Sequence, residues 1–182
     1  MGFKMFSVIT LVLLSINTAQ AELYIEASAE AGGEDLITTN SADSISAGGG
    51  IKFAIGVQSP LNYSQSTDIR LTVGYLSDSI LASNGEAEFN TVTFDAMLVS
   101  YFWPHSFGLG ATMHMSPQYR DNVMGYASEV IDYDDAIGLV FQYSYHFVPG
   151  LELGVRYTDL TYTTGSLQQD AGSLGIFISN GF

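Results

Sequence analysis

Apolar and polar residues alternate with a period of two along most of this chain. Near the start of the first run, Leu23 and Ile25 alternate with Tyr24 and Glu26. Successive side chains of a β-strand point to opposite faces, so this pattern predicts strands with one apolar face. Eight runs of this kind follow one another, at residues 23–31, 50–58, 69–75, 91–102, 107–115, 137–147, 151–157 and 174–182.

The polar positions of these runs favour a membrane barrel over a soluble β-sandwich, which is the alternative that alternation leaves open. A sandwich turns its polar face to water and is expected to carry many Lys and Glu residues there. Here that face carries mainly Gly, Ser, Thr and Ala, which fit the narrow interior of a small barrel. A closed sheet leaves no unpaired edge in lipid. We therefore predict an all-β fold, an eight-stranded antiparallel up-and-down transmembrane β-barrel with its apolar face outward.

The connections between runs alternate between short and long. Short ones are expected at Pro104-His105, at 148–150 and, somewhat longer, at 59–67. Four longer, acidic connections are expected near residues 33–48, 77–90, 117–135 and 160–171. Short turns in the periplasm and long loops outside are typical of outer-membrane barrels. Aromatic residues near both ends suggest two interfacial girdles: Tyr101, Phe102, Trp103, Phe107, Tyr145, Phe147 and Phe182 by the turns, and Tyr75, Tyr119, Tyr126, Tyr133, Tyr157 and Tyr162 by the loops.

The first 21 residues have the pattern of a cleaved secretory signal peptide. Lys4 supplies a positive charge, residues 6–16 an apolar run, and Ala19 and Ala21 the small residues of a cleavage site. The run is well short of the roughly 20 residues that a spanning helix needs, although an uncleaved anchor is the alternative. We therefore divide the chain into a signal peptide, 1–21, and a barrel domain, 22–182.

The charge balance excludes several classes of function. The 182 residues include 19 acidic and five basic ones, for a formal net charge of −14. Binding of nucleic acid is excluded because it requires clustered Lys and Arg. No cysteine is present, so neither disulfides nor thiol chemistry is available. We expect no cofactor, and the Cys and His clusters that hold structural metals are missing from the sequence.

Nine ionisable residues occupy inward positions of the predicted strands. A buried charge persists when it is paired and hydrogen-bonded, so we expect these residues to close the lumen as a charge network. The alternative is an open, porin-like channel, for which eight strands leave little room. The predicted network consists of Glu26, Glu30, Lys52, Arg70, Asp95, His114, His146, Glu152 and Arg156.

The final run carries a recognisable pattern. Leu174, Ile176, Ile178 and Phe182 share one face and end on an aromatic residue. Together with the leader and the eight runs, it makes the barrel domain resemble the small outer-membrane proteins of the OmpA-barrel and OmpX/Ail type. The resemblance implies a bacterial outer-membrane location, a C-terminal signal read by the barrel-assembly machinery, and contact with outer-membrane lipids and lipopolysaccharide. Asn180 departs from the pattern, because an aromatic residue is common there.

One constellation suggests chemistry. If Pro104-His105 forms a two-residue turn, Asp95 lies opposite His114, with Ser116 two residues further on the same inward face. A carboxylate, an imidazole and a hydroxyl are the parts of a nucleophilic site. His114-Met115-Ser116 also resembles the His-x-Ser of the lipid A deacylase barrels, although Pro117 follows where those enzymes usually have asparagine. The alternative is a structural Asp–His pair.

The acidic connections offer a last candidate. Glu129, Asp132, Asp134 and Asp135 could supply oxygen ligands to divalent cations, which could bridge to lipopolysaccharide phosphates. A solvated acidic rim is the simpler interpretation, because no Asp-x-Asp-x-Asp-Gly loop is present. The favoured function is a non-enzymatic outer-membrane protein that contributes to envelope integrity or surface interaction. A lipid A deacylase using His114 and Ser116 comes second, and a small channel third.

Overall fold

The computed structural model describes residues 21–38, 44–61, 66–82, 85–123 and 128–182 of the chain. Eight long strands make the barrel: β1 (Glu22–Ala31), β4 (Gly50–Pro60), β5 (Thr67–Ala82), β6 (Gly85–Phe102), β7 (His105–Val123), β9 (Ala136–Val148), β10 (Leu151–Asp159) and β13 (Ser173–Gly181). In the described part of the chain, no helix is long and apolar enough to cross a membrane. The predicted signal peptide lies outside the described residues, apart from residue 21.

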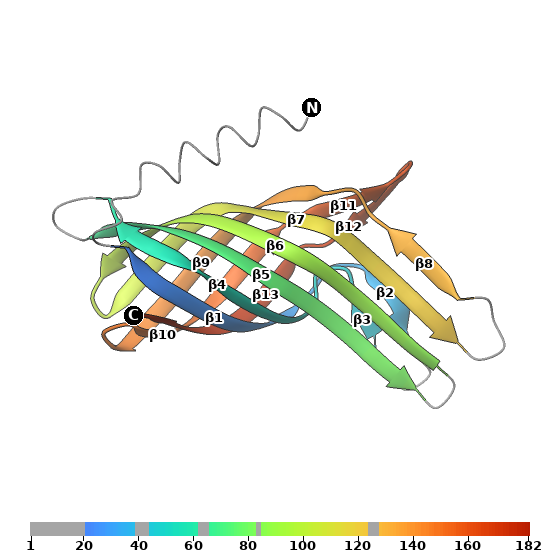
Figure 1. Ribbon diagram of the computed structural model, residues 1–182, viewed down its shortest axis with the longest axis horizontal. Helices are drawn as coiled ribbons and strands as arrows, with labels where there is room; N and C mark the ends of the chain where they lie inside the picture. The colour runs from blue at the N-terminus through green and yellow to red at the C-terminus, as the bar shows by residue number, and fades with distance from the viewer. Residues whose placement is uncertain (1–20, 39–43, 62–65, 83–84, 124–127) are drawn as a thin grey trace.

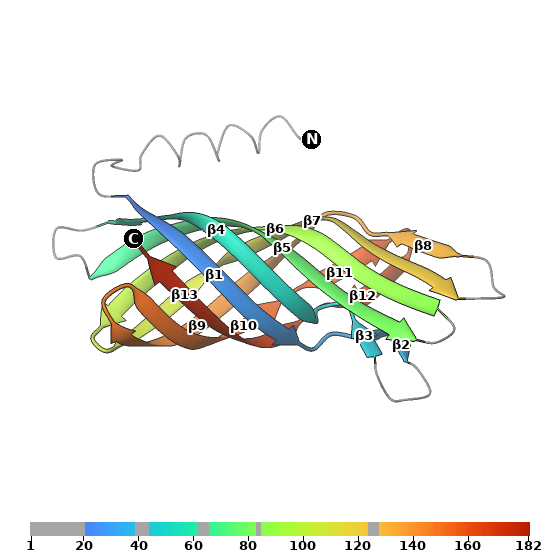
Figure 2. The same ribbon diagram turned by 60° about the horizontal axis from the view of Figure 1, so that its bottom comes forward.

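The sheet closes on itself. Consecutive barrel strands pair antiparallel, and β1 pairs with both β4 and β13, so the ring has no free edge along the barrel wall. At the seam, the backbone N–H of Phe182 donates to the Leu23 carbonyl over 2.9 Å, and the Leu23 N–H donates back over 3.2 Å. Figures 1 and 2 show the tilted strands wrapping around one long axis. The fold is the closed eight-stranded antiparallel barrel that the sequence predicts.

The two faces of each strand differ as the alternation predicts. In β9, odd-numbered residues such as Phe141 are exposed on the outer wall, whereas Gln142 and Ser144 are buried inside. The same holds in β13, where Leu174, Ile176 and Ile178 are all exposed. An apolar outer wall around a polar interior is the arrangement of a barrel in lipid, the reverse of a soluble protein.

Short turns join the strands at one end of the barrel, at the left of Figure 1. Pro149 and Gly150 connect β9 to β10, and Trp103 and Pro104 connect β6 to β7. The second turn corrects a sequence prediction. His105 belongs to β7 and pairs with Phe102, so the turn lies one residue earlier than expected.

Strands extend the other end of the barrel, at the right of Figure 1, where the sequence predicted loops. The β5–β6 hairpin stays paired as far as Ala82 and Gly85, through most of the segment 77–90. β7 continues to Val123 and pairs with β8 (Glu129–Asp132). Two small hairpins, β2 (Asp35–Thr38) with β3 (Ser44–Ser46) and β11 (Thr161–Thr164) with β12 (Leu167–Asp170), complete this end. The prediction failed because apolar alternation weakens where the strands leave the lipid-facing belt.

An apolar cluster closes the extended end of the barrel from within. Its largest fully buried side chains are Ile45, Leu76, Phe89 and Tyr162, each no more than 1% exposed. The rings of Phe89 and Tyr133 lie 5.7 and 5.5 Å from the ring of Tyr162, which β11 brings inward. We call this group the outer plug; its other buried members are Ala47, Ala87, Tyr119, Tyr133, Ala136, Leu160 and Ala171.

The outer plug corrects the predicted girdle on that side. Tyr75 and Tyr157 are exposed on the outer wall, but Tyr119, Tyr133 and Tyr162 are buried in the plug. Tyr126 lies outside the described residues. Burial raises the pKa of the Tyr119 hydroxyl to about 12 and raises that of Tyr133 as well. Both hydroxyls therefore stay protonated under physiological conditions.

Candidate functional site

The middle of the lumen is organised around Glu26 on β1. Arg156 on β10 donates to both carboxylate oxygens of Glu26, over 2.5 and 2.6 Å, in a bidentate pair. Lys52 on β4 places its Nζ 3.8 Å from the same carboxylate. Both partners are at most 5% exposed, in an interior where a charge pair is strong and an unpaired charge is costly. These three residues tie β1, β4 and β10 together across the lumen.

Lys52 also reaches β6. Its Nζ donates to Asp95 Oδ2 over 2.9 Å, and Thr112 Oγ1 donates to Asp95 Oδ1 over 2.6 Å. Thr72 donates to Oδ2 over 3.3 Å. Asp95 is thus surrounded by donors from three other strands, while Glu30 lies 4.0 Å from the Lys52 ammonium at the edge of the network.

A second centre lies nearer the short turns, around Glu152 on β10. Arg70 Nη2 lies 2.7 Å from Glu152 Oε1 and its Nη1 donates to the Tyr24 hydroxyl over 2.8 Å. The Tyr24 hydroxyl is 2.9 Å from Glu26, which links the two centres. Ser144 and Ser179 donate to Glu152 over 2.6 and 2.7 Å. Hence neither acceptor oxygen of Glu152 lacks a donor.

His146 completes this centre at the level of the turns. Its Nε2 lies 3.1 Å from Ser106 Oγ and 3.5 Å from Glu152 Oε2. The ring also packs against Tyr101 and Trp103, with centroids 5.4 and 5.8 Å away. The structure therefore brings eight of the nine predicted lumen residues into one connected set; His114, the ninth, forms its hydrogen bond with Tyr162 instead.

The structure contradicts the predicted Asp95–His114 pair. Because Phe102 pairs with His105, Asp95 lies opposite Thr112 and His114 lies opposite Thr93. The predicted pairing is two residues out of register. The side chains keep their inward face, since a shift of two preserves the face of a strand.

His114 instead belongs to the underside of the outer plug. Its Nδ1 and the Tyr162 hydroxyl are 2.5 Å apart, and the two rings lie at a centroid distance of 5.8 Å. Ser116 does not join it. A β-bulge opposite Thr91 interrupts the ladder between the pairs Asn90–Gln118 and Val92–Met115, and Ser116 in that bulge has a φ of 49°.

The bulge separates the two parts of the proposed dyad. Ser116 is exposed, whereas His114 is buried on the inner side of β7. The backbone N–H of Ser116 donates to Asp135 Oδ1 over 2.9 Å. A bulge inserts one extra residue and so re-aims the side chains around it. His114, Ser116 and Asp95 therefore do not form a nucleophilic site.

The four carboxylates proposed as metal ligands are all exposed. Those that accept a hydrogen bond each do so from a different residue. Asp132 accepts from Gln118 over 2.6 Å, Asp134 from Thr163 over 3.3 Å, and Asp135 from Ser116. Glu129 begins β8. Within the described ranges, no group of three or more His, Cys, Asp or Glu residues could hold a metal ion.

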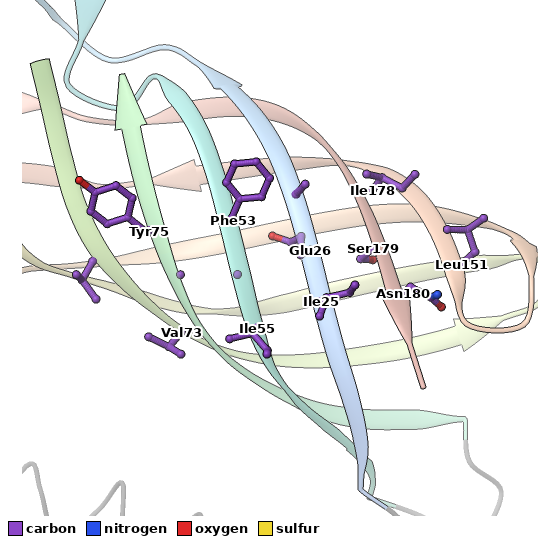
Figure 3. Close-up of a pocket in the computed structure, with 14 residues that line it drawn as sticks. Ile25, Glu26, Phe53, Ile55, Val73, Tyr75, Leu151, Ile178, Ser179 and Asn180 are labelled. Atoms are coloured by element: carbon purple, nitrogen blue, oxygen red, sulfur yellow. The ribbon is translucent and has the colours of Figure 1, made fainter. Parts of the chain in front are cut away.

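An open groove of about 800 Å³ crosses the outer wall between two rows of mostly apolar side chains. Ile178, Ala27 and Phe53 pair side by side in one row, and Asn180, Ile25 and Ile55 pair in the other. Figure 3 shows outward-facing side chains such as Phe53, Ile55 and Ile178 along the groove, together with Glu26 and Ser179, which are buried on the inner side of the wall. The groove lies mainly on the apolar outer wall, although Glu26 and Ser179 are among the residues that line it.

Comparison with known proteins identifies the fold. No family model and no curated protein matches this chain. Ail, the attachment invasion locus protein of Yersinia pestis, is similar in structure, both in complex with the heparin analogue sucrose octasulfate (TM-score 0.57, 10% identity) and without it (TM-score 0.55, 11% identity). Neisserial surface protein A is also similar (TM-score 0.51, 16% identity). Each alignment covers 89% of this chain and 97% of the other.

These likenesses agree with the apolar outer wall and the closed ring of strands. The chain has the fold and the lipid-facing surface of a bacterial outer-membrane β-barrel. Sequence reasoning missed the outer plug, whose members are separated by polar residues. Its one available signal was the presence of Tyr133 and Tyr162 in segments otherwise rich in Asp and Thr.

Proposed function

We propose that this outer-membrane barrel is a non-enzymatic protein with a closed, charge-paired lumen, which contributes to envelope integrity or surface interaction through its acidic outer end. The observation that carries the proposal is the filling of the lumen at two levels. Paired charges centred on Glu26 and Glu152 occupy the lumen from its middle toward the short turns, and the outer plug covers the extended end. A solute has no open path through such a barrel, because eight strands enclose little more than their own side chains.

The outer end supplies the surface for interaction. Exposed acidic side chains gather on the extensions beyond the barrel wall, and Arg120 is the one exposed Lys or Arg in their described parts. A negative field of this kind repels polyanions and attracts basic partners. The exposed or half-exposed acidic residues are Glu34, Asp35, Asp78, Glu86, Glu88, Asp121, Glu129, Asp132, Asp134, Asp135, Asp159 and Asp170.

This charge pattern separates the chain from the Ail structure that carries a heparin analogue. Sucrose octasulfate is a polyanion, and its binding calls for basic groups. The single exposed Arg120 amid carboxylates does not supply them. We therefore propose basic proteins or cation-bridged lipopolysaccharide as partners of the outer end, rather than sulfated sugars.

Three measurements on the same deletion strain and purified protein test the proposal. Conductance across planar bilayers should show no steady open channel, and mass spectrometry should find the same lipid A with and without the protein. Deletion should make the cells more sensitive to detergent, and expression of either the wild-type chain or Ser116→Ala should restore their resistance. A steady channel, or a change in lipid A acylation that depends on Ser116, would overturn it.

Topology is tested separately. Cysteines placed at Glu86 and Asp134 should react with a membrane-impermeant maleimide on intact cells, and a cysteine at Pro149 should react only after the outer membrane is opened. The chain has no cysteine of its own, so each label reports one site. Labelling of Pro149→Cys on intact cells would reverse the assignment of outer and periplasmic ends.

A further inference from the structure

A patch of aromatic rings on the outer wall, at the short-turn end, contains a histidine. Its members come from β6, β7 and β9 and are all exposed. Neighbouring rings contact one another, with centroids 5.2 to 6.3 Å apart. We call this group the turn-end patch: Phe102, His105, Phe107, Tyr143, Tyr145 and Phe147.

His105 is held in place by two tyrosines. Its ring stacks on Tyr143 at 5.9 Å with an interplanar angle of 23°, and its Nδ1 lies 2.9 Å from the Tyr143 hydroxyl. The ring of Tyr145 meets it edge-on at 5.6 Å. In the described part of the chain, His105 Nε2 and the Tyr145 hydroxyl have no hydrogen-bond partner. Two polar groups are therefore left available side by side on the outer wall.

The position of His105 is unusual for its chemistry. Lys52, Arg70 and Arg156 are buried in the lumen, and so are His114 and His146. Arg120 lies on the outer extension. Over the described outer wall of the barrel, His105 is thus the one side chain able to carry positive charge. A ring nitrogen left unpaired in hydrocarbon is costly, so the place of His105 Nε2 among interfacial tyrosines points to a ligand at the headgroup level.

We propose that His105, with Tyr145 beside it, binds the headgroup phosphate of an anionic phospholipid in the periplasmic leaflet. The imidazole Nε2–H and the Tyr145 hydroxyl would donate to phosphate oxygens, and the surrounding Phe rings would contact the upper acyl chains. Donors next to a group that can be cationic favour an anion through charge-assisted hydrogen bonds. This inference rests on the proposed membrane placement of the barrel, but not on a surface role for its acidic end.

The protein contains its own reporter. Trp103 is the sole tryptophan, is exposed, and lies in the turn two residues before His105. The folded full chain is placed in phosphatidylcholine vesicles that contain equal fractions of brominated phosphatidylglycerol or brominated phosphatidylcholine. Quenching of Trp103 then reports which lipid lies next to the turn-end patch.

In the wild type, brominated phosphatidylglycerol should quench more strongly, with a local enrichment of about two- to fivefold, the size of an exposed charge pair. His105→Phe, which keeps a ring on the strand, should bring the ratio to one, and Tyr145→Phe should reduce it. Tyr75→Phe is the matched control, because it removes an exposed tyrosine hydroxyl toward the other end of the barrel and should leave the ratio unchanged. Heat-modifiable migration on a gel checks that each variant is folded.

Other outcomes count against the inference. Equal quenching by both lipids in the wild type, or a preference that survives His105→Phe, would overturn the lipid site. Loss of the preference on adding excess inorganic phosphate, at constant ionic strength, would assign the site to a free anion and overturn the lipid assignment. Absence of quenching by either lipid would instead overturn the membrane placement on which the inference rests.

Discussion

Arg156 and Glu26 face each other across the lumen and are joined by two parallel hydrogen bonds, of 2.5 and 2.6 Å. The pair lies at the junction of the two lumen centres, because Glu26 also accepts from Tyr24, which in turn accepts from Arg70. Removing either partner leaves the other charge buried without its counter-ion.

We therefore expect Glu26→Gln to destabilise the folded barrel by about 3–5 kcal/mol, because it leaves Arg156 and Lys52 short of a carboxylate. The measurement is urea unfolding in lipid vesicles, followed by Trp103 fluorescence. Glu86→Gln, at an exposed position of the extension, is the control and should change the free energy of unfolding by no more than about 0.5 kcal/mol. Equal effects of the two substitutions would show that the network contributes nothing to stability.

The register of β6 and β7 can be tested with cysteines. Phe94 and Met113 form a cross-strand pair on the outer wall, whereas the register expected from a Pro104-His105 turn would pair Phe94 with Met115. Paired Cα atoms lie about 4.5–5.5 Å apart, within disulfide reach, and diagonal neighbours about 7–8 Å apart. On mild oxidation, F94C/M113C should form a disulfide readily and F94C/M115C poorly, as gel mobility would reveal. Preferential bridging of the second pair would restore the expected turn.

Tyr162 connects the outer plug to His114. We expect Tyr162→Ala to cost about 3–5 kcal/mol, since it empties a fully buried ring position and leaves His114 without its partner. Protease cleavage in the 161–170 hairpin of the reconstituted barrel should become faster. Leu167→Ala, at an exposed site of the same hairpin, should not have this effect. Unchanged protection in Tyr162→Ala would mean that the hairpin is held by other contacts.

Phe182 remains the predicted terminus of an assembly signal formed with Leu174, Ile176 and Ile178. We expect Phe182→Ser to slow insertion and lower the amount of folded, heat-modifiable protein in cells, because it removes the aromatic end of that apolar face. Phe147→Ser is the control: it removes an exposed aromatic ring near the same end of the barrel but outside the signal. Similar losses in both variants would indicate a general need for interfacial aromatics, not a signal.

The sequence predicts best what lipid and lumen impose residue by residue. Every strand residue in the lipid-facing belt faces either lipid, as Leu153 does, or the lumen, as Glu152 does. The sequence therefore alternates between apolar and polar residues with a period of two. Register is not recorded in this way. The Trp103-Pro104 turn and a Pro104-His105 turn place the same residues on the same faces, so alternation could not distinguish them.

Beyond the lipid-facing belt, the sequence no longer alternates in a way that predicts strands. Leu81 and Glu86 pair across the β5–β6 hairpin although neither follows an apolar alternation, because hydrogen bonds between backbones are sufficient there. The plug is also hidden from sequence reasoning. Ile45 lies on β3 and Tyr162 on β11, far apart in the chain. Their shared burial depends on how the two small hairpins fold over the end of the barrel.

The bulge at Ser116 changes which residues of β7 face the inside of the barrel. Before it, even-numbered residues such as Thr112 and His114 point inward; after it, odd-numbered Pro117 and Tyr119 do. The neighbouring strand β6 has no such change, and its odd-numbered residues Thr91 and Asp95 both face inward. A mutational scan of β7 should therefore show that intolerance of bulkier side chains, which have no room inside the barrel, switches from even to odd positions at this bulge. Because the bulge holds one extra residue, deleting Ser116 would restore an unbroken alternation along β7 and leave Tyr119 inside and Arg120 outside.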